Sequence, residues 1–393
     1  MNPSRPSSPS RPAPSSSAAR SALAAYLHTP AWATHGGGAA AGGNLPDTAQ
    51  VVLATRARVA RNLADFPFPG RANDKALRSV AQEVRRAALA DTERLADLAP
   101  VAIAPLAARD RARLVDARRI SPELAQGGAH RWALLDEAGA LSIFINEEDH
   151  VRIQALVAGS AIAAALGDAF DADRRLRARL TYATDVRWGY LTTSLANVGT
   201  GLRLSVLVHL PALAFLGRLP DTLRAAHHLG ISVRGAHGEH SLAAGDLYQV
   251  SNAVTFGLEP SHIAGRVRPV ANYLSEAERA ARAEVRDAHA ARAIEAARSA
   301  WTRIERADRL AAGETLDLLS RLRLSAGCGL TPLGGHAPAP NAALFASLVA
   351  DLRTGAGLAA PLDGATVAAS VQDAIQRPAK IRTALRAFYR NKE

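Results

Sequence analysis

The stretch Gln50-Val51-Val52-Leu53-Ala54-Thr55-Arg56-Ala57-Arg58-Val59 decides the fold of this chain. Its apolar run predicts a β-strand, and because the side chains of a strand alternate between faces, Arg56 and Arg58 point the same way. Two parallel guanidinium groups repel each other unless an anion lies between them. The segment therefore predicts an anion site on one face of a sheet. The alternative is a pair of solvated arginines on an edge strand.

A second apolar strand, Leu141-Ser142-Ile143-Phe144-Ile145-Asn146, ends abruptly in the carboxylates Glu147, Glu148 and Asp149. Strand ends that open into polar loops often carry functional residues. We therefore expect part of a site here, with a solvated acidic turn as the alternative.

A glycine-bearing turn, Asn197-Val198-Gly199-Thr200-Gly201, precedes Arg203 and a further apolar strand. Glycines allow backbone N–H groups to approach an anion closely. His209, near the end of that strand, is interpreted as a core histidine rather than a catalyst.

The short strand Ile231-Ser232-Val233 leads into Arg234-Gly235-Ala236-His237-Gly238-Glu239. The two glycines predict a mobile loop, and a mobile loop with a carboxylate can close over a substrate and exclude water. The alternative is a hairpin in which Glu239 pairs with Arg234.

Together these four segments predict a phosphoryl-transfer site. Such a site holds a triphosphate in line and neutralises its developing charge with cations and Mg²⁺. Arginine suits this work because its planar fork of donors matches phosphate oxygens. The P-loop pattern G-x-x-x-x-G-K-[ST] is absent, and lysine occurs only at Lys75, Lys380 and Lys392.

In this order and spacing the segments resemble the ATP:guanido phosphotransferase family, which includes arginine and creatine kinases, from about residue 51 to residue 280. The likeness extends to Arg61-Asn62-Leu63, Phe66-Pro67-Phe68-Pro69 and Leu247-Tyr248-Gln249-Val250-Ser251-Asn252. Three features resemble the bacterial protein-arginine kinases (McsB type): the low-complexity segment in place of a folded N-terminal domain, the long C-terminal segment, and Val208-His209-Leu210-Pro211-Ala212-Leu213. The resemblance implies an α+β fold, a mainly antiparallel, glutamine-synthetase-like sheet flanked by helices, plus a helical C-terminal domain.

The resemblance also implies roles for matching residues. Glu148 would orient the substrate guanidinium and take its proton, and Glu239 would grip the same group from the closing loop. A guanidinium has a pKa above about 12, so its nitrogen needs a base before it can attack. Ser194 and Asn197 would lie on the substrate side. The implied nucleotide-binding residues are Ala54, Thr55, Arg56, Ala57, Arg58, Arg118, Arg152, Arg203, Leu204, Ser205, Val206, Leu207, Arg234, Gly235, Ala236, His237 and Gly238.

The chain departs from the family pattern in several places. Ala54 replaces a serine, Ser194-Leu195-Ala196 replaces Cys-Pro-Thr, and Arg118 stands where a nucleotide-contacting histidine would fall. No Arg-Asp-x-x-Arg-Ala phosphoarginine-sensing motif is found near the C-terminus.

The expected activity is transfer of the ATP γ-phosphoryl group to arginine side chains of proteins in protein quality control, with ATP as the nucleotide and Mg²⁺ carried by ATP rather than by a protein metal site. The expected partners are arginine-bearing client proteins, with an activator protein, a Clp-type protease or chaperone, and a second copy in a homodimer as further candidates. The alternatives are a small-molecule guanidino (arginine) kinase and a catalytically silent arginine-binding adaptor.

The composition of the 393 residues, 48% apolar with one cysteine, predicts a large core, no internal disulfide and a reducing, cytoplasmic compartment. Cys328 is expected to be buried. The sequence contains no run of 18 apolar residues, so no membrane span is expected. The formal charge of +11 suggests nucleic acid, but only 5% of residues are aromatic and the arginines are scattered, which argues against specific binding.

Three domains are expected. Residues 1–45 read as a disordered Ser/Pro/Arg/Gly-rich tail, for which an organellar transit peptide is the alternative and a secretory signal is not expected. Residues 46–275 form the catalytic domain and 276–393 the helical C-terminal domain. Ser275 with Glu278 matches a capping box at the start of a helix.

Overall fold

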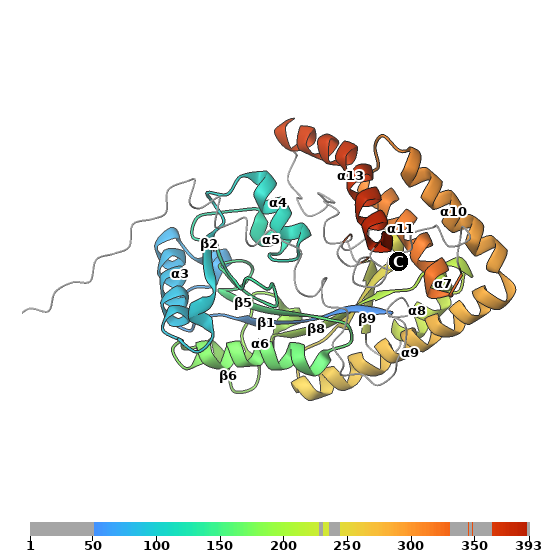
Figure 1. The fold of residues 1–393 in the computed structure, drawn as a ribbon. Coiled ribbons are helices and arrows are strands. Elements are labelled where there is room, and N and C mark those ends of the chain that lie inside the picture. Colours follow the sequence, from blue (N-terminus) through green and yellow to red (C-terminus); the bar gives the residue numbers. More distant parts are fainter. Residues whose placement is uncertain are drawn as a thin grey trace, which may run out of the picture.

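The computed structural model describes residues 51–227, 231–235, 244–330, 345, 348 and 364–390. Its centre is an eight-stranded sheet in the order β2-β3-β4-β5-β1-β8-β10-β9, in which all neighbouring strands are antiparallel (Figure 1). The strands are β1 (Val52–Arg61), β2 (Ala99–Ala102), β3 (Trp132–Leu135), β4 (Leu141–Ile145), β5 (Val151–Ala158), β8 (Leu202–His209), β9 (Ile231–Gly235) and β10 (Leu247–Asn252), with a separate pair, β6 (Thr184–Asp185) and β7 (Gly189–Tyr190). The predicted α+β fold with a mainly antiparallel sheet is confirmed.

Helices lie on both sides of the sheet and make up the C-terminal part of the described chain. The α-helices are α3 (Asp74–Leu89), α4 (Ala108–Asp116), α5 (Pro122–Ala125), α6 (Ile162–Arg177), α7 (Pro211–Phe215), α8 (Leu219–His227), α9 (Pro260–Ala288), α10 (Ala290–Arg306), α11 (Ala312–Gly327) and α13 (Gly364–Arg390). Short 3₁₀ turns include η3 (Leu95–Asp97), η4 (Leu195–Asn197) and η5 (Ala244–Asp246). Among the described residues, no helix is both long and apolar enough to cross a bilayer.

Strand β1 lies inside the sheet. It pairs with β5 on one side, where Arg58 faces Gln154, and with β8 on the other, where Arg58 faces Arg203. The edge-strand alternative for Arg56 and Arg58 is therefore wrong. The predicted strand and the shared face of the two arginines are both present.

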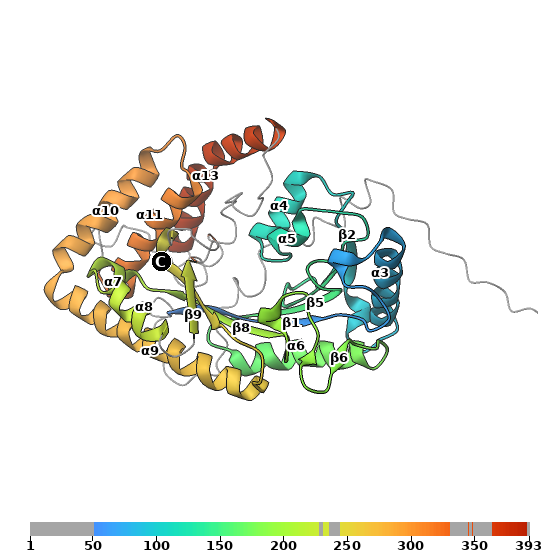
Figure 2. The same cartoon turned by 180° about the vertical axis from the view of Figure 1, so that it is seen from behind.

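One face of the sheet is apolar and covered. Val59, Ile153 and Leu204 belong to a large buried cluster, and helices α6 and α9 run beneath this face (Figures 1 and 2). The alternation of strand side chains then places the intervening residues, among them Arg58 and Arg203, on the opposite face.

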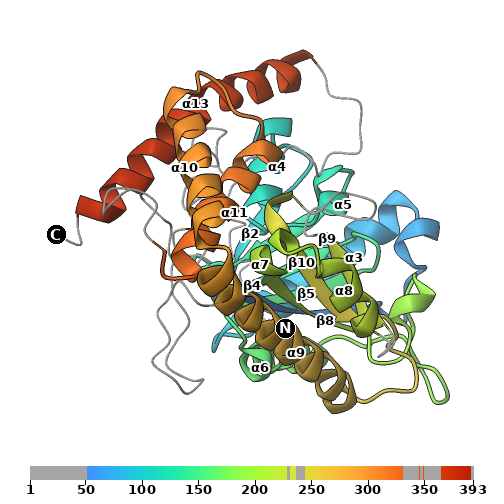
Figure 3. The same cartoon turned by 90° about the vertical axis from the view of Figure 1, so that its right-hand side faces the viewer.

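The opposite face is bounded by two smaller apolar clusters. In one of them, Leu114 of α4 and Leu124 of α5 belong to the same buried cluster as Phe144 of β4. Toward the other end, Leu156 and Leu207 pack with residues of the C-terminal helices α10, α11 and α13. Helices α4 and α13 approach each other above this face (Figures 1 and 3). The polar residues of the central strands therefore lie between two helical walls.

The predicted capping box at Ser275 is wrong. Ser275 lies inside α9, which begins at Pro260, and its hydroxyl donates to the carbonyl of Ala271 at 2.7 Å. The buried Glu278 instead accepts hydrogen bonds from the backbone N–H groups of Ala212 and Leu213 at the start of α7. Ser275 and Glu278 therefore match the capping-box pattern in sequence only, and the Glu278 carboxylate caps a different helix. Helix α9 runs unbroken across residue 275. The predicted boundary there, between a catalytic domain and a helical C-terminal domain, stays a prediction.

Two predicted core residues are buried. His209 is fully buried, where Nε2 lies 2.8 Å from the hydroxyl of Ser320 and Nδ1 lies 2.6 Å from the guanidinium of Arg323. Burial raises the pKa of the Cys328 thiol to about 11, so it is a poor nucleophile at neutral pH. The predicted tail, residues 1–45, lies outside the described residues.

Candidate active site

The register of the sheet gathers arginines from four strands on its polar face. Residues that face each other across antiparallel strands project to the same side. Arg58 of β1 faces Arg203 of β8, Ala60 of β1 faces Arg152 of β5, and Gln249 of β10 faces Arg234 of β9. Five of the six arginines predicted to bind the nucleotide, Arg56, Arg58, Arg152, Arg203 and Arg234, therefore share one face.

These arginines line a cavity of about 720 Å³. Its described lining contains six arginines but only three glutamates. The lining residues are Arg56, Arg58, Ala60, Glu123, Gln126, Arg131, Glu147, Glu148, Arg152, Ser194, Ala196, Asn197, Gly201, Arg203, Arg234, Gly235, Gln249 and Ser251. The excess of cations suits an anionic ligand.

The arginines on β1 and β8 destabilise one another's charge. Burial, together with Arg152 and Arg203, lowers the pKa of Arg58 to about 9. Burial and the neighbouring guanidinium groups also lower the pKa of Arg56 and of Arg203. Within the described part of the chain, the Nε atoms of Arg56 and Arg203 are buried and have no hydrogen-bond partner. A bound anion would satisfy these donors and relieve the repulsion.

Arg152 is different because two carboxylates hold it. Its Nη1 lies 2.5 Å from Glu147 and its Nη2 lies 2.6 Å from Glu148. Burial opposes the charge of Arg152, but the two glutamates raise its pKa above the usual value. The Glu147 carboxylate is fully buried and also accepts a hydrogen bond from Ser121. The Glu148 side chain is 38% exposed and faces the cavity.

The acidic turn is built into the core. Asp149 is fully buried and its Oδ1 accepts from the Asn62 amide and from the backbone N–H of Thr193, both at 2.7 Å. The Thr193 hydroxyl donates to the carbonyl of Glu148 at 2.8 Å. The alternative of a solvated acidic turn is therefore wrong. These bonds fix Glu148 beside the segment that carries Ser194 and Asn197.

His150 completes this framework as a neutral group. Its Nδ1 accepts from the backbone N–H of Leu63 at 3.1 Å, and its Nε2 lies 3.0 Å from the carbonyl of Pro67. Burial lowers the pKa of His150 to about 4, so the ring is neutral at pH 7. Both ring nitrogens are committed to backbone atoms, which leaves His150 a positioning role.

The predicted glycine turn has a packing role. Gly201 has a φ of 65°, and a Cβ there would lie 2.5 Å from the carbonyl oxygen of Ala60 in β1. The Ala60 N–H donates to the Gly201 carbonyl at 3.0 Å. A side chain at residue 201 would therefore push β8 away from β1 and separate Arg58 from Arg203.

The structure brings together nine of the predicted site residues in the cavity lining: Arg56, Arg58, Glu148, Arg152, Ser194, Asn197, Arg203, Arg234 and Gly235. Eight others are not among its described lining: Ala54, Thr55, Ala57, Arg118, Leu204, Ser205, Val206 and Leu207. Ala57, Leu204 and Val206 belong to the covered apolar face, and the Thr55 hydroxyl donates to the Gly159 carbonyl. Arg118 lies close enough to lower the pKa of Arg56, although burial and Arg58 contribute more. Ala236, His237, Gly238 and Glu239 lie outside the described residues.

Several lining residues were missed by sequence reasoning. Gln249 and Ser251 are two residues apart on β10, as Arg56 and Arg58 are on β1, so both project to the same face. This period of two could have predicted them as lining residues. Glu123, Gln126 and Arg131 come from α5 and the segment after it. Their place above the sheet depends on tertiary packing, which no local pattern shows.

Comparison with known proteins gives a consistent result. The family model "ATP:guanido phosphotransferase, C-terminal catalytic domain" matches residues 79–281. The protein-arginine kinase of Shouchella clausii is 41% identical over 236 residues, which is 60% of this chain and 66% of that protein. Those of Caldanaerobacter subterraneus and Syntrophomonas wolfei are 34% and 32% identical, covering 71% and 86% of this chain and 83% and 91% of theirs.

Solved structures with this fold include a lombricine kinase, with a TM-score of 0.53 and 22% identity over 61% of this chain and 69% of that one. Another is the duplicated taurocyamine kinase from Schistosoma mansoni with bound transition-state-analogue components, with a TM-score of 0.53 and 21% identity over 67% of this chain and 39% of that one. At these identities the likeness concerns the fold alone.

Proposed function

Because the chain belongs to the ATP:guanido phosphotransferase family, we propose that it is a protein-arginine kinase, which transfers the γ-phosphoryl group of ATP to arginine side chains of proteins. One observation carries the proposal. Half-buried arginines that lower one another's pKa line the same cavity as a partly exposed glutamate held by Arg152. This arrangement offers an anion site and a base within one cavity.

In the proposed reaction, a guanidino nitrogen of the client arginine attacks the γ-phosphorus. A P–N bond forms, the bond between the γ-phosphorus and the bridging oxygen breaks, and ADP leaves with the electron pair. Glu148 accepts the proton lost by the guanidinium. Its neighbour Arg152 fixes one carboxylate oxygen at 2.6 Å, so the base is held in place before substrate binds.

Arg56, Arg58 and Arg203 would hold the phosphates of ATP, and Mg²⁺ would enter with the nucleotide. These cations would neutralise charge that moves from the γ-phosphoryl group toward ADP in the transition state. Arg234, also in the lining, would add a donor from β9. Glu239 would grip the substrate guanidinium from the segment outside the described residues.

The proposed partners are client proteins with accessible arginines, within protein quality control. An activator protein, a Clp-type protease or chaperone, and a homodimer remain expectations from the family resemblance. The single cysteine, Cys328, supports a reducing, cytoplasmic compartment as the proposed location.

The direct test uses ATP labelled in its γ-phosphate, with an arginine-rich denatured protein or free arginine at equal guanidine concentration. We expect acid-labile label on the protein, and slower labelling of free arginine, which brings less binding energy to the site. The variant Glu148→Gln is the matched control for catalysis by this site. Faster labelling of free arginine, with no label on any protein, would establish the small-molecule kinase instead. Nucleotide binding without any label would indicate the silent adaptor.

A further inference from the structure

Exposed apolar side chains are concentrated in two segments of the described chain. Of its eight large exposed apolar residues, five lie in two short segments: Val186, Trp188, Leu195, Val254 and Phe256. The other three, Leu89, Tyr273 and Ile375, lie on three different helices. Single exposed apolar residues are ordinary, but a cluster marks a binding surface. We refer to the five residues as the apolar patch.

The two segments of the patch are packed on each other. The rings of Trp188 and Phe256 lie 5.1 Å apart. Thr255, between Val254 and Phe256, is buried and its hydroxyl donates to the carbonyls of Ala196 at 2.9 Å and Val198 at 2.7 Å. Val254 and Phe256, on either side of Thr255 in the chain, are exposed.

The patch adjoins the lining of the cavity. Leu195, which is 87% exposed, lies in the chain between Ser194 and Ala196, and both of these line the cavity. An extended polypeptide advances about 3.3 Å per residue. A client arginine whose guanidinium reaches Glu148 therefore brings residues a few positions away over Leu195.

Leu195 is held outward by its surroundings rather than by chance. The 3₁₀ turn η4 (Leu195–Asn197) closes through the N–H of Asn197 to the carbonyl of Ser194 at 3.0 Å, and the Thr255 hydroxyl fixes the Ala196 carbonyl. With the backbone fixed on both sides, the leucine side chain stands beside the opening. Covering its exposed apolar surface with another apolar group would lower the free energy of the complex.

We propose that the apolar patch binds apolar side chains that flank the target arginine in a client polypeptide. The inference rests on the proposed function and adds a preference to it: arginines in apolar, unfolded segments are phosphorylated ahead of arginines in polar segments. Continuity between the patch and the cavity selects this occupant over a separate partner. The patch would contribute to KM, because it touches the client away from the reacting atoms.

The test compares two short peptides with one central arginine each. One carries leucine and phenylalanine within three positions of the arginine, and the other carries serine at the same positions. For the wild-type enzyme we expect kcat/KM to be about tenfold higher for the apolar peptide, mainly through a lower KM. In Leu195→Ser and Val254→Ser we expect this ratio to fall by about threefold or more. Leu89→Ser, an exposed leucine on α3, is the matched control and should keep the wild-type ratio.

Three outcomes would overturn the inference. Equal kcat/KM for the two peptides in the wild type removes the preference while the proposed function stands. In a second outcome, both patch variants keep the wild-type ratio of kcat/KM between the two peptides. If these variants also change in sedimentation or in melting temperature, and Leu89→Ser does not, the patch is assigned to a second copy or to a segment of the chain itself. Labelling of free arginine but of neither peptide overturns the proposed function and this inference together.

Discussion

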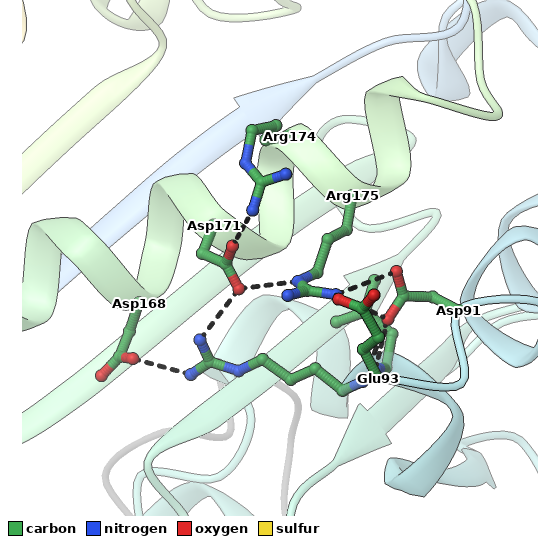
Figure 4. A network of polar contacts seen from close by, with 8 residues as sticks. Asp91, Glu93, Asp168, Asp171, Arg174 and Arg175 are labelled. Carbon is green, nitrogen blue, oxygen red and sulfur yellow. Dashed lines mark hydrogen bonds and ion pairs between the residues drawn. The ribbon is translucent and has the colours of Figure 1, made fainter.

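Two groups of arginines in this molecule are built in opposite ways. Arg174 and Arg175 of α6, with Arg94 next to this helix, are interleaved with the carboxylates of Asp91, Glu93, Asp168 and Asp171 (Figure 4). Arg94 lies 2.7 Å from Asp168, and Arg175 lies 2.8 Å from Asp171. The hydrogen bonds that Arg175 donates to Asp171 and Glu93 raise its pKa, whereas burial and like charges lower the pKa of Arg58 in the cavity.

The difference shows what each group is for. Carboxylates satisfy the arginines beside α6, so that network joins α6 to the segment around Asp91 and needs no ligand. Burial and like charges lower the pKa of Arg56, Arg58 and Arg203, so the folded protein carries unfavourable charge there until an anion binds. Arg152 of the cavity group is paired with Glu147 and with Glu148, the proposed base.

The largest effect should come from the carboxylate of the cavity. Glu148→Gln keeps the shape of the side chain but removes the proton acceptor, so we expect kcat to fall about 100-fold or more while Mg²⁺-ADP affinity changes little. Asp168→Asn, which changes a carboxylate of the network in the same way, should keep the wild-type rate. A Glu148→Gln enzyme with more than about a tenth of the wild-type rate would show that this residue is not the base.

The next largest effect should be on nucleotide affinity, which variants of the cavity arginines should lower and variants of the α6 network should not. Arg58→Ala and Arg203→Ala each remove a charge-assisted phosphate contact, so calorimetry should show Mg²⁺-ADP binding weakened about 10- to 100-fold. Arg175→Ala should leave the affinity at the wild-type value. If both cavity variants bind ADP as the wild type does, these arginines do not face the phosphates.

Stability without ligand should move in opposite directions in the two groups. The pKa of Arg58 is lower in the folded chain than in the unfolded chain, so its charge destabilises the fold fully below about pH 9 and less as the pH rises above that value. At pH 7, Arg58→Met should therefore raise the free energy of unfolding by about 1 kcal/mol, allowing for screening by solvent. Arg175→Met should lower it slightly, as expected for a partly exposed ion pair. Thermal unfolding of the ligand-free proteins measures both, and a lower melting temperature for Arg58→Met would contradict the account.

The smallest effect should come from Arg118, which influences Arg56 from beyond the described lining. Arg118 has a φ of 58°, and asparagine tolerates this backbone conformation. We expect Arg118→Asn to weaken Mg²⁺-ADP binding by less than about threefold, well below the effect of Arg203→Ala, because Arg118 affects the pKa of Arg56 less than burial and Arg58 do. An effect as large as that of Arg203→Ala would place Arg118 directly on the nucleotide.

The sequence was sufficient wherever the information is local. The period of two in β1 predicts that Arg56 and Arg58 share a face, and the apolar run before Glu147 predicts a strand that ends at the site. The covered apolar face also follows from alternation. What the sequence cannot supply is the partner of each group across the fold.

Two examples show that limit. Glu278 looked like a local cap for Ser275, yet its buried carboxylate caps α7, 66 residues earlier in the chain. Glu147 and Glu148 are adjacent and identical in type, but Ser121 and burial hold the first inside the core while the second faces the cavity. In both cases a long-range contact decides the role, and no window of neighbouring residues contains it.

The central place of β1 in the sheet has a consequence for how the chain folds. Strand β1 reaches its neighbours only across long loops, since Arg58 faces Gln154 on one side and Arg203 on the other. Contacts of such sequence separation form late, because the entropy of closing the loop opposes them until the flanking elements are in place. During synthesis, the nascent chain therefore cannot assemble its proposed nucleotide site until β8 has emerged and docked. Until then Arg56 and Arg58 remain ordinary arginines with ordinary pKa values, and affinity for ATP should appear as a late, all-or-none step of folding.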